Sequence, residues 1–297
     1  MIKRYPMPMP YGWFQVAYSH ELKAGDAKPI RYFGKDMVLF RTESGEASCL
    51  DAFCPHMGAH LGYGIHEFSG KGGEVEAENI VCPFHGWKFN TKGVCEEIPY
   101  AKNIPPKIKD KECIKRHNLV ERNQCIWVWY HPEDKAPMWE VETIAEANSD
   151  EWSDVQVHRR VIKTHIQEIA ENGADHAHFH FVHGTAEMPQ VTRTEFDEHY
   201  RSLELTSKLD TPKGKADGRI ELKSFGPGQA VTYFEGICDT VLMGNVSHIE
   251  DELIEVNFGF LQKKVDGKVP EGGVNAAIIA DICQQIEEDA PIWENKI

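Results

Sequence analysis

Two short loops, each pairing a cysteine with a histidine, constrain this sequence more than any other feature. The first reads Cys54-Pro55-His56 and the second reads Cys82-Pro83-Phe84-His85. A proline after each cysteine stiffens the loop, and Gly58 and Gly86, close behind the histidines, allow a tight turn. Thiolates and imidazoles are metal ligands, and the two loops together supply two of each. We therefore expect a fold that brings both loops around one metal group.

Two metal groups accept such ligands. Structural zinc of the Cys₂His₂ kind normally pairs cysteine with cysteine and histidine with histidine, not one of each in both loops. Two thiolates on one iron and two imidazoles on the other are the ligation of a Rieske [2Fe–2S] centre. The spacing therefore favours the iron–sulfur cluster and leaves zinc as the remote alternative. The predicted cluster ligands are Cys54, His56, Cys82 and His85, whereas His60 and His66 are predicted to be loop histidines.

The residues around these loops have the pattern of short strands. Aromatic and branched residues occur in runs that are separated by turn-forming segments such as Gly34-Lys35-Asp36. Strands are predicted at 13–18, 30–33, 37–41, 47–50 and 125–130. This spacing favours a small antiparallel sandwich or barrel. The polar, proline-bounded segment 131–137 predicts a boundary, with one domain at 1–136 and a second at 137–297.

The second half of the chain mixes helical and strand patterns. Ile162, Ile166 and Ile169 recur at near-helical spacing, which predicts a helical segment within 161–183. Strands are predicted at 199–208, 229–238, 240–249 and 253–261, and a final helix at 274–288.

Composition excludes several classes of protein. The 297 residues carry a formal net charge of −15, which repels phosphate backbones, so nucleic acid is not an expected partner. No apolar run is long enough to span a membrane, and no apolar segment follows the basic N-terminus as in a secretory signal. The expected location is the cytoplasm. In that reducing compartment the eight cysteines are not a disulfide framework, and most are predicted to be small buried side chains.

A histidine-rich stretch at 171–183 is the second candidate metal site. It contains four histidines and an aspartate among small and aromatic residues, and it has no Lys, Arg or Ser. Imidazole is the commonest transition-metal ligand, and a carboxylate is its usual companion. The alternative is a helix whose imidazole rings only hydrogen-bond to their neighbours.

The two stretches together resemble Rieske ring-hydroxylating oxygenases. The loops 54–56 and 82–87 are similar to the cluster-binding pattern of that family. They lack the additional cysteine pair that forms a disulfide in respiratory-chain Rieske proteins. The order Asn172-x-x-Asp175-x-x-His178-x-x-x-x-His183 resembles the family's mononuclear-iron motif. The resemblance implies an α+β fold, with an N-terminal all-β Rieske [2Fe–2S] domain followed by a catalytic helix-grip domain that has an antiparallel sheet and flanking helices.

The resemblance implies that His178 and His183 are the imidazole ligands of a mononuclear non-haem Fe(II). Residues five apart differ by about 140° around an ideal helix, so we expect the helix to break before His183. Helical spacing alone would group His183 with His176 and His180. Those two are predicted to support the site without binding the metal.

The carboxylate ligand must come from elsewhere in the chain. The segment 286–294 resembles the one that supplies it in steroid-type members of the family, which implies Asp289. The neighbouring carboxylates remain alternatives, and they are Asp281, Glu287 and Glu288.

By the same resemblance, Asp175 is a bridging residue. It would contact His178 in its own chain and, across an interface, the partner subunit's His85. Asn172 begins the motif and is a catalytic candidate together with Asp175. A homotrimer in which electrons cross between chains is implied, because in the family the two metals of one subunit lie too far apart.

The expected activity is that of the oxygenase component of a multicomponent Rieske monooxygenase, with one [2Fe–2S] cluster and one mononuclear Fe(II) per chain. The segments 171–189 and 289–296 resemble the branch of 3-ketosteroid 9α-hydroxylases and cholesterol 7-desaturases, so a steroid is the first expected substrate. An aromatic or other small apolar ring compound is the second. Because no G-x-G-x-x-G fingerprint follows a strand, NAD(P)H is expected to bind a separate reductase, with or without a ferredoxin. An electron carrier without oxygenase activity is the alternative of a different class.

Overall fold

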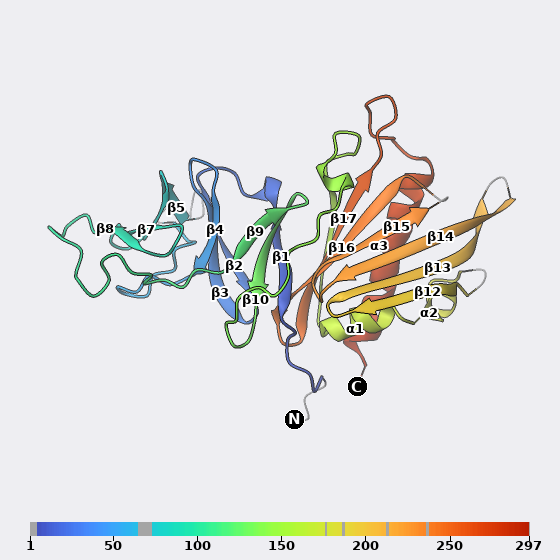
Figure 1. The fold of residues 1–297 in the computed structure, drawn as a ribbon, viewed down its shortest axis with the longest axis horizontal. Coiled ribbons are helices and arrows are strands. Elements are labelled where there is room, and N and C mark those ends of the chain that lie inside the picture. The colour runs from blue at the N-terminus through green and yellow to red at the C-terminus, as the bar shows by residue number, and fades with distance from the viewer. Residues whose placement is uncertain are drawn as a thin grey trace. The chain divides into compact units, whose positions relative to one another are not determined.

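The computed structural model describes residues 5–64, 73–175, 177–185, 188–211, 214–235 and 238–296 (Figure 1). The chain divides into two compact units. The N-terminal unit consists of Val16–Tyr130 and Asp134–Met138. The C-terminal unit consists of Met1–Gln15, His131–Glu133 and Trp139–Ile297. The boundary that the sequence predicts after residue 136 stays a prediction.

The residues that precede the N-terminal unit belong to the C-terminal unit because side chains deep in that unit bind them. Asn245 donates from Nδ2 to Oε1 of Gln15 at 2.7 Å, and the Ser247 hydroxyl donates to the Gln15 carbonyl at 2.6 Å. Gln15, Asn245 and Ser247 are all buried. Since an unpaired buried amide costs about 1–3 kcal/mol, these contacts hold Gln15 firmly. No sequence pattern pointed to this pairing.

The N-terminal unit contains antiparallel sheets, as predicted. One sheet has the order β4-β3-β2-β5-β6-β7-β8, and a smaller one has the order β1-β10-β9, in which β1 carries the chain from one unit into the other. The elements are β1 (Gly12–Tyr18), η1 (Ser19–Glu21), β2 (Asp26–Tyr32), β3 (Lys35–Arg41), β4 (Ala47–Asp51), β5 (Gly73–Glu76), β6 (Asn79–Val81), β7 (Lys88–Asn90), β8 (Cys95–Glu97), β9 (Leu119–Arg122) and β10 (Cys125–Tyr130).

The core of the N-terminal unit reaches the two Cys–His loops. Fully buried Val38, Phe40 and Phe89 from the larger sheet pack in one cluster with Cys54 and Cys82. Both cysteines are 2% exposed. Packing of this kind fixes the loops at their cysteine ends, because a close-packed interior leaves little room for a side chain to shift.

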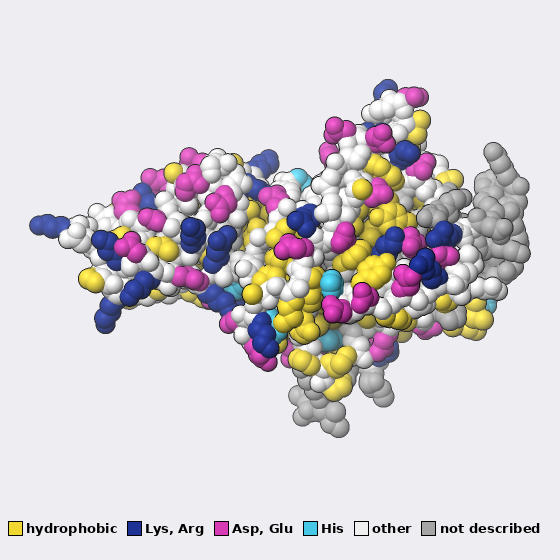
Figure 2. Space-filling view, in the orientation of Figure 1, with side chains coloured by type: hydrophobic (Ala, Val, Ile, Leu, Met, Phe, Trp, Pro, Cys, Tyr) yellow, Lys and Arg dark blue, Asp and Glu magenta, His cyan; other side chains and the backbone are white. Residues whose placement is uncertain are grey.

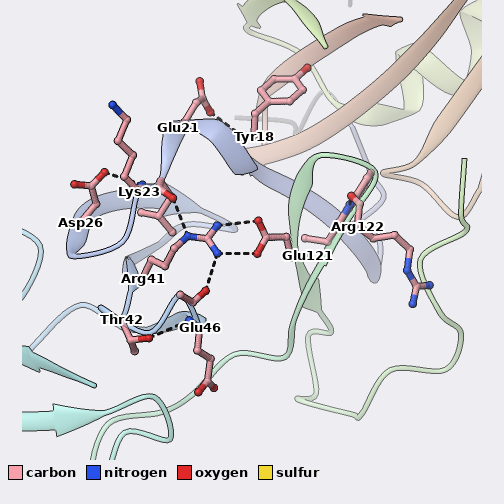
Figure 3. A network of polar contacts seen from close by, with 12 residues as sticks. Tyr18, Glu21, Lys23, Asp26, Arg41, Thr42, Glu46, Glu121 and Arg122 are labelled. Atoms are coloured by element: carbon pink, nitrogen blue, oxygen red, sulfur yellow. Dashed lines mark hydrogen bonds and ion pairs between the residues drawn. The ribbon is translucent and has the colours of Figure 1, made fainter. Parts of the chain in front are cut away.

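Arg41 ties the two sheets of the N-terminal unit together (Figure 3). Its guanidinium forms two parallel bonds to Glu121 of β9, at 2.9 and 2.8 Å. It also donates to the carbonyls of Leu22 and Gly45 at 2.8 and 2.9 Å. Bidentate pairs of this kind are stronger than a single exposed ion pair. The Arg41 hydrogen bonds lower the pKa of Glu121 below its ordinary value of 4.5.

Replacing Glu121 with glutamine is expected to lower the free energy of unfolding by about 1 kcal/mol at pH 7. Because the pKa of Glu121 is lowered in the folded state, its stabilising effect is complete above pH 4.5 and is lost as the pH falls through the lowered value. Denaturant unfolding of Glu121→Gln and wild type between pH 7 and pH 4 measures the difference. The control is Glu46→Gln. The Glu46 backbone N–H donates to the Thr42 hydroxyl, and this hydrogen bond does not depend on the side chain at position 46. An equal stability of both variants at pH 7 would contradict the prediction.

The C-terminal unit contains one antiparallel sheet with the order β11-β17-β16-β15-β14-β13-β12. The long helix α3 packs on one face of this sheet (Figure 1), where Ile279 belongs to one buried cluster with Phe234, Leu242 and Phe260. The elements are β11 (Gln156–Ile162), α1 (Ile166–Asn172), α2 (His178–Phe181), β12 (Gln190–Asp197), β13 (Tyr200–Thr211), β14 (Gly214–Phe225), β15 (Ala230–Glu235), β16 (Thr240–Glu250), β17 (Leu253–Gln262) and α3 (Gly273–Glu294), with η3 (Glu146–Asn148) before them.

The C-terminal unit differs from the sequence prediction in several ways, and strands β11 and β14 were not predicted. The start of the predicted 161–183 helical segment is wrong, because Ile162 ends β11 and pairs with Ile254 in the sheet. Strand β12 was missed, and all of its residues are exposed, so it has no apolar signal. Helix α3 ends at Glu294 rather than Glu288 and contains Pro291. Within the described residues, no helix has both the length and the apolar composition required to cross a bilayer.

Candidate metal centres

The two Cys–His loops have the same backbone hydrogen bonds. In the first loop the Cys54 N–H donates to the Ala59 carbonyl at 2.8 Å, and the Gly58 N–H donates to the Cys54 carbonyl at 2.9 Å. In the second loop the Cys82 N–H donates to Trp87 at 2.8 Å, and the Gly86 N–H donates to Cys82 at 2.9 Å. Gly58 and Gly86 have φ values of 74° and 70°, which favour glycine. The predicted tight turns are therefore present in both loops.

These loops bring like ligands together. A hydrogen bond joins the thiols of Cys54 and Cys82, and the ring centroids of His56 and His85 lie 4.8 Å apart. The hydrogen bond from Cys54 lowers the pKa of Cys82 to about 6, with help from the backbone N–H groups of Phe84 and His85. The same hydrogen bond between the two thiols raises the pKa of Cys54. Two paired thiols beside two paired imidazoles fit a cluster whose irons have separate sulfur and nitrogen ligands.

The histidine side of this centre lies toward solvent and the cysteine side toward the core. His56 is exposed and stacks on Trp87 with 4.6 Å between ring centroids, whereas both cysteines are buried. The Trp87 indole N–H donates to the Tyr100 hydroxyl at 2.7 Å, which holds the stacked ring in place. His60 accepts a hydrogen bond from the Gly62 N–H at 3.0 Å, as suits a loop histidine. His66 lies outside the described residues.

The second centre brings two histidines of one short stretch together with an aspartate more distant in the sequence. One nitrogen of His178, one nitrogen of His183 and one carboxylate oxygen of Asp289 all lie within 4.8 Å of one another. The Nε2 atom of His178 is buried and has no hydrogen-bond partner among the residues that the structure describes. A buried imidazole nitrogen without a partner is costly unless a ligand satisfies it. Two histidines and one carboxylate are the donor set of non-haem Fe(II) sites, so these residues fit that metal.

The predicted helix break is present and positions both histidines. Helix α1 ends at Asn172, and α2 runs only from His178 to Phe181, so His183 lies beyond it. The chain therefore leaves helical geometry on both sides of α2. His178 and His183 come close, with 5.1 Å between ring centroids, although their spacing on one continuous helix would separate them.

Asp289 reaches the centre from α3. Its Oδ2 lies 3.4 Å from Nε2 of His183, and the two side chains are 6% and 2% exposed. Burial raises the pKa of Asp289, and its contacts with His183, His178 and Asn172 oppose the shift. The Asn172 amide donates to Asp289 Oδ2 at 3.3 Å. Asn172 thus links the end of α1 to the carboxylate, a placement that the sequence did not predict.

Asp175 contacts His178 through its main chain. The Asp175 carbonyl oxygen is hydrogen-bonded to Nδ1 of His178, and the Asp175 carboxylate accepts from the Ala177 N–H at 3.0 Å. Asp175 is exposed. The sequence predicted a contact between Asp175 and His178. The contact in the structure is made by the backbone carbonyl of Asp175, and the Asp175 side chain lies at the surface.

The remaining candidates have other partners. His180 is hydrogen-bonded to the Thr185 carbonyl at 2.6 Å, and His176 lies outside the described residues. Asp281 accepts from the Gln285 amide at 2.8 Å, and Glu287 faces Arg160 at 3.5 Å. Among the contacts that the described residues make, Glu288 is the one alternative carboxylate that reaches a candidate ligand, His183, and it does so at Nδ1. That hydrogen bond lowers the pKa of Glu288.

Two family models match the chain. Residues 12–110 match the Rieske [2Fe-2S] domain, and residues 128–297 match the 3-ketosteroid 9alpha-hydroxylase C-terminal domain. Among similar proteins, the oxygenase component of 3-ketosteroid-9-alpha-monooxygenase from Rhodococcus rhodochrous is 29% identical, over 96% of this chain and 74% of that protein. Cholesterol 7-desaturase from Bombyx mori is 30% identical, over 100% of this chain and 66% of that protein. Cholesterol 7-desaturase nvd 1 from Ciona intestinalis is 33% identical, over 85% of this chain and 51% of that protein. The chain thus spans about half to three quarters of the length of these curated relatives.

Solved structures share the fold. A Pseudomonas putida CBB5 NdmA QL mutant with theobromine aligns with a TM-score of 0.74 and 18% identity, over 96% of this chain and 81% of that one. Dicamba monooxygenase bound to dicamba aligns with a TM-score of 0.72 and 14% identity, over 95% and 86%. At such low identity the likeness concerns the fold alone. The family matches go further: this chain belongs to the Rieske oxygenases, with a Rieske [2Fe–2S] domain followed by the C-terminal domain of the 3-ketosteroid 9α-hydroxylase type.

Proposed function

We propose that the chain is the oxygenase component of a steroid monooxygenase. The convergence of His178, His183 and Asp289 is the observation that carries this proposal, because an electron carrier needs no second metal site. The relatives named as 3-ketosteroid monooxygenase and cholesterol 7-desaturase support a steroid ring system as substrate. Hydroxylation is the first proposed reaction and desaturation the second.

Each metal has its own proposed ligands. Cys54, Cys82, His56 and His85 would hold the [2Fe–2S] cluster, and His178, His183 and Asp289 would hold a mononuclear Fe(II). When bound, this ferrous ion supplies a centre that binds and activates O₂ with electrons delivered by the cluster.

The surrounding residues of the chain prepare the mononuclear site. Burial of His183 and Asp289 excludes water from two of the ligands. The Asn172 amide hydrogen-bonds one carboxylate oxygen of Asp289 and so limits its rotation. The hydrogen bond between the Asp175 carbonyl and Nδ1 of His178 limits the rotation of the His178 ring. Asn172 and Asp175 would thus act on the ligands, and Asp175 would also contact the partner subunit's His85 through its exposed carboxylate.

The proposed partners follow from the same assignment. A separate NAD(P)H-dependent reductase, with or without a ferredoxin, would supply electrons, and a homotrimer would place each cluster beside a neighbouring mononuclear site. The net charge of −15 favours a partner with a basic docking surface. On the face shown in Figure 2, acidic side chains are interspersed with basic ones. We propose a cytoplasmic location.

A product-based substrate screen tests the proposed function. The purified chain, a surrogate reductase and NADH are incubated with 3-ketosteroids, sterols and small aromatic acids, and products are identified by mass. Hydroxylation adds one oxygen atom, whereas desaturation removes two hydrogens, so the measurement distinguishes the two reactions. Turnover of aromatic acids but not steroids would instead support the small-ring alternative.

Metal content tests the assignment to an oxygenase. An oxygenase is expected to hold about three irons per chain, two in the cluster and one in the mononuclear site. Two irons per chain without any product would support an electron carrier. Zinc without a reduced-cluster EPR signal would contradict both.

A further inference from the structure

The carboxylate of Glu288 lies behind the imidazole of His183. Its Oε2 is 2.8 Å from Nδ1, while Oδ2 of the adjacent Asp289 is 3.4 Å from Nε2 of the same ring. Two consecutive residues of α3 thus contact opposite nitrogens of one imidazole. We propose that Glu288 is a positioning residue that accepts the Nδ1–H of His183 and thereby presents Nε2 to the mononuclear metal. This inference rests on the proposed function of the site.

The reason is the tautomer of the ring. A neutral imidazole carries one proton, and only the nitrogen without it can bind a metal. A carboxylate at Nδ1 keeps the proton on that nitrogen and holds the plane of the ring, because a charged acceptor forms a stronger hydrogen bond than a neutral one. Nε2 of His183 is then available on the side where Asp289 lies.

His178 has the same arrangement with a different acceptor. Its Nδ1 is hydrogen-bonded to the Asp175 carbonyl, and its buried Nε2 has no hydrogen-bond partner in the described part of the chain. In both rings an acceptor lies at Nδ1, and Nε2 is therefore the nitrogen left to bind a metal. The acceptor for His178 is a main-chain atom that any residue at position 175 supplies. The acceptor for His183 is the side chain of Glu288, so this second hydrogen bond depends on which residue occupies position 288.

Glu288 is itself held in place. The Gln284 amide, one helical turn earlier, donates to Oε1 of Glu288 at 3.1 Å. That bond occupies one carboxylate oxygen and leaves Oε2 for His183. The Glu288 side chain is 35% exposed, whereas that of Asp289 is 6% exposed. The two neighbouring carboxylates therefore have different roles, one at the rim of the site and one inside it.

The test is the affinity of the variant Glu288→Ala for Fe(II). We expect a loss of about 10- to 100-fold with an intact cluster signal, measured by competition with a ferrous chelator. The EPR spectrum of the nitric oxide adduct of the bound Fe(II) should also change, because the ring of His183 is no longer held. Glu288→Gln keeps an oxygen acceptor and should restore part of the affinity. Gln284→Ala should lose less affinity than Glu288→Ala.

Asp281→Ala is the matched control, because Asp281 also pairs with a glutamine four residues away on α3 and, within the described residues, is not part of the group formed by His178, His183 and Asp289. Its iron affinity should equal that of wild type. Wild-type affinity and an unchanged nitric oxide spectrum in Glu288→Ala would overturn the positioning role. Complete iron loss without rescue in Glu288→Gln would also overturn it, since Glu288 would then be a ligand. If Asp289→Ala also retains iron, the proposed assignment of Asp289 as the carboxylate ligand fails. If Asp289→Ala loses iron while Glu288→Ala binds normally, only the positioning role of Glu288 fails.

Discussion

Asp289→Ala is expected to lose the mononuclear iron and keep the [2Fe–2S] cluster. Iron content should fall from about three to about two per chain, and product formation should fall below detection. The physical reason is that two imidazoles alone leave the ion without the carboxylate that completes its set of protein ligands and balances its charge. Iron analysis together with the EPR signal of the reduced cluster measures both metals in one sample.

The structure also sets the controls for this variant. Removing the carboxylate leaves the Asn172 amide without its acceptor, which costs about 1–3 kcal/mol, so stability must be measured in parallel. Asp289→Asn keeps the side-chain shape and an oxygen for Asn172, and it should still bind iron poorly because it lacks the charge. Asp281→Ala should retain all of the iron. Unchanged iron content in both Asp289 variants would transfer the ligand role to Glu288, Glu287 or Asp281.

Asp175→Ala is expected to keep both metals and lose coupled turnover. The contact of residue 175 with His178 is made by the backbone carbonyl, which alanine also has, so the His178 ring should stay oriented. The carboxylate that would reach the partner subunit's His85 is removed. Oxidation of the reduced cluster by O₂ in the presence of substrate should slow by about 100-fold, as for other losses of a positioned contact. Single-turnover absorbance of the cluster measures this rate directly.

Asp175→Asn distinguishes the proposed contact with the partner subunit's His85 from the hydrogen bond that Asp175 accepts from Ala177. Asparagine can still accept the hydrogen bond from the Ala177 N–H, whose loss in Asp175→Ala costs about 1 kcal/mol. Asp175→Asn should therefore match the stability of wild type and still transfer electrons slowly. Fast cluster oxidation in Asp175→Ala would rule out the bridging role. Iron loss in that variant would mean that the carboxylate supports His178 directly.

The sequence alone pointed to both candidate metal centres: the Cys–His loops did so by their local spacing, and His178, His183 and Asp289 did so by the resemblance to a family. Two separate pairs of a cysteine and a histidine two or three residues apart match the ligand set of a Rieske cluster, which one such pair alone would not. The break before His183 was also predictable, since a continuous helix would turn His178 and His183 apart. The long strands near the end of the chain follow from apolar patterning that burial requires.

Only the tertiary structure distinguished the carboxylates of α3. Consecutive helical residues point about 100° apart, so which of Glu287, Glu288 and Asp289 faces the histidines depends on where α3 lies against the sheet and α2. The sequence treated Glu288 as an alternative ligand, and the structure places it at Nδ1 of His183, opposite Asp289. The attachment of Gln15 to Asn245 likewise required the fold, because contacts between residues so distant in sequence leave no local pattern. Local spacing and resemblance thus determined which residues are candidate ligands, and packing decided which atoms of His183 lie beside Glu288 and Asp289.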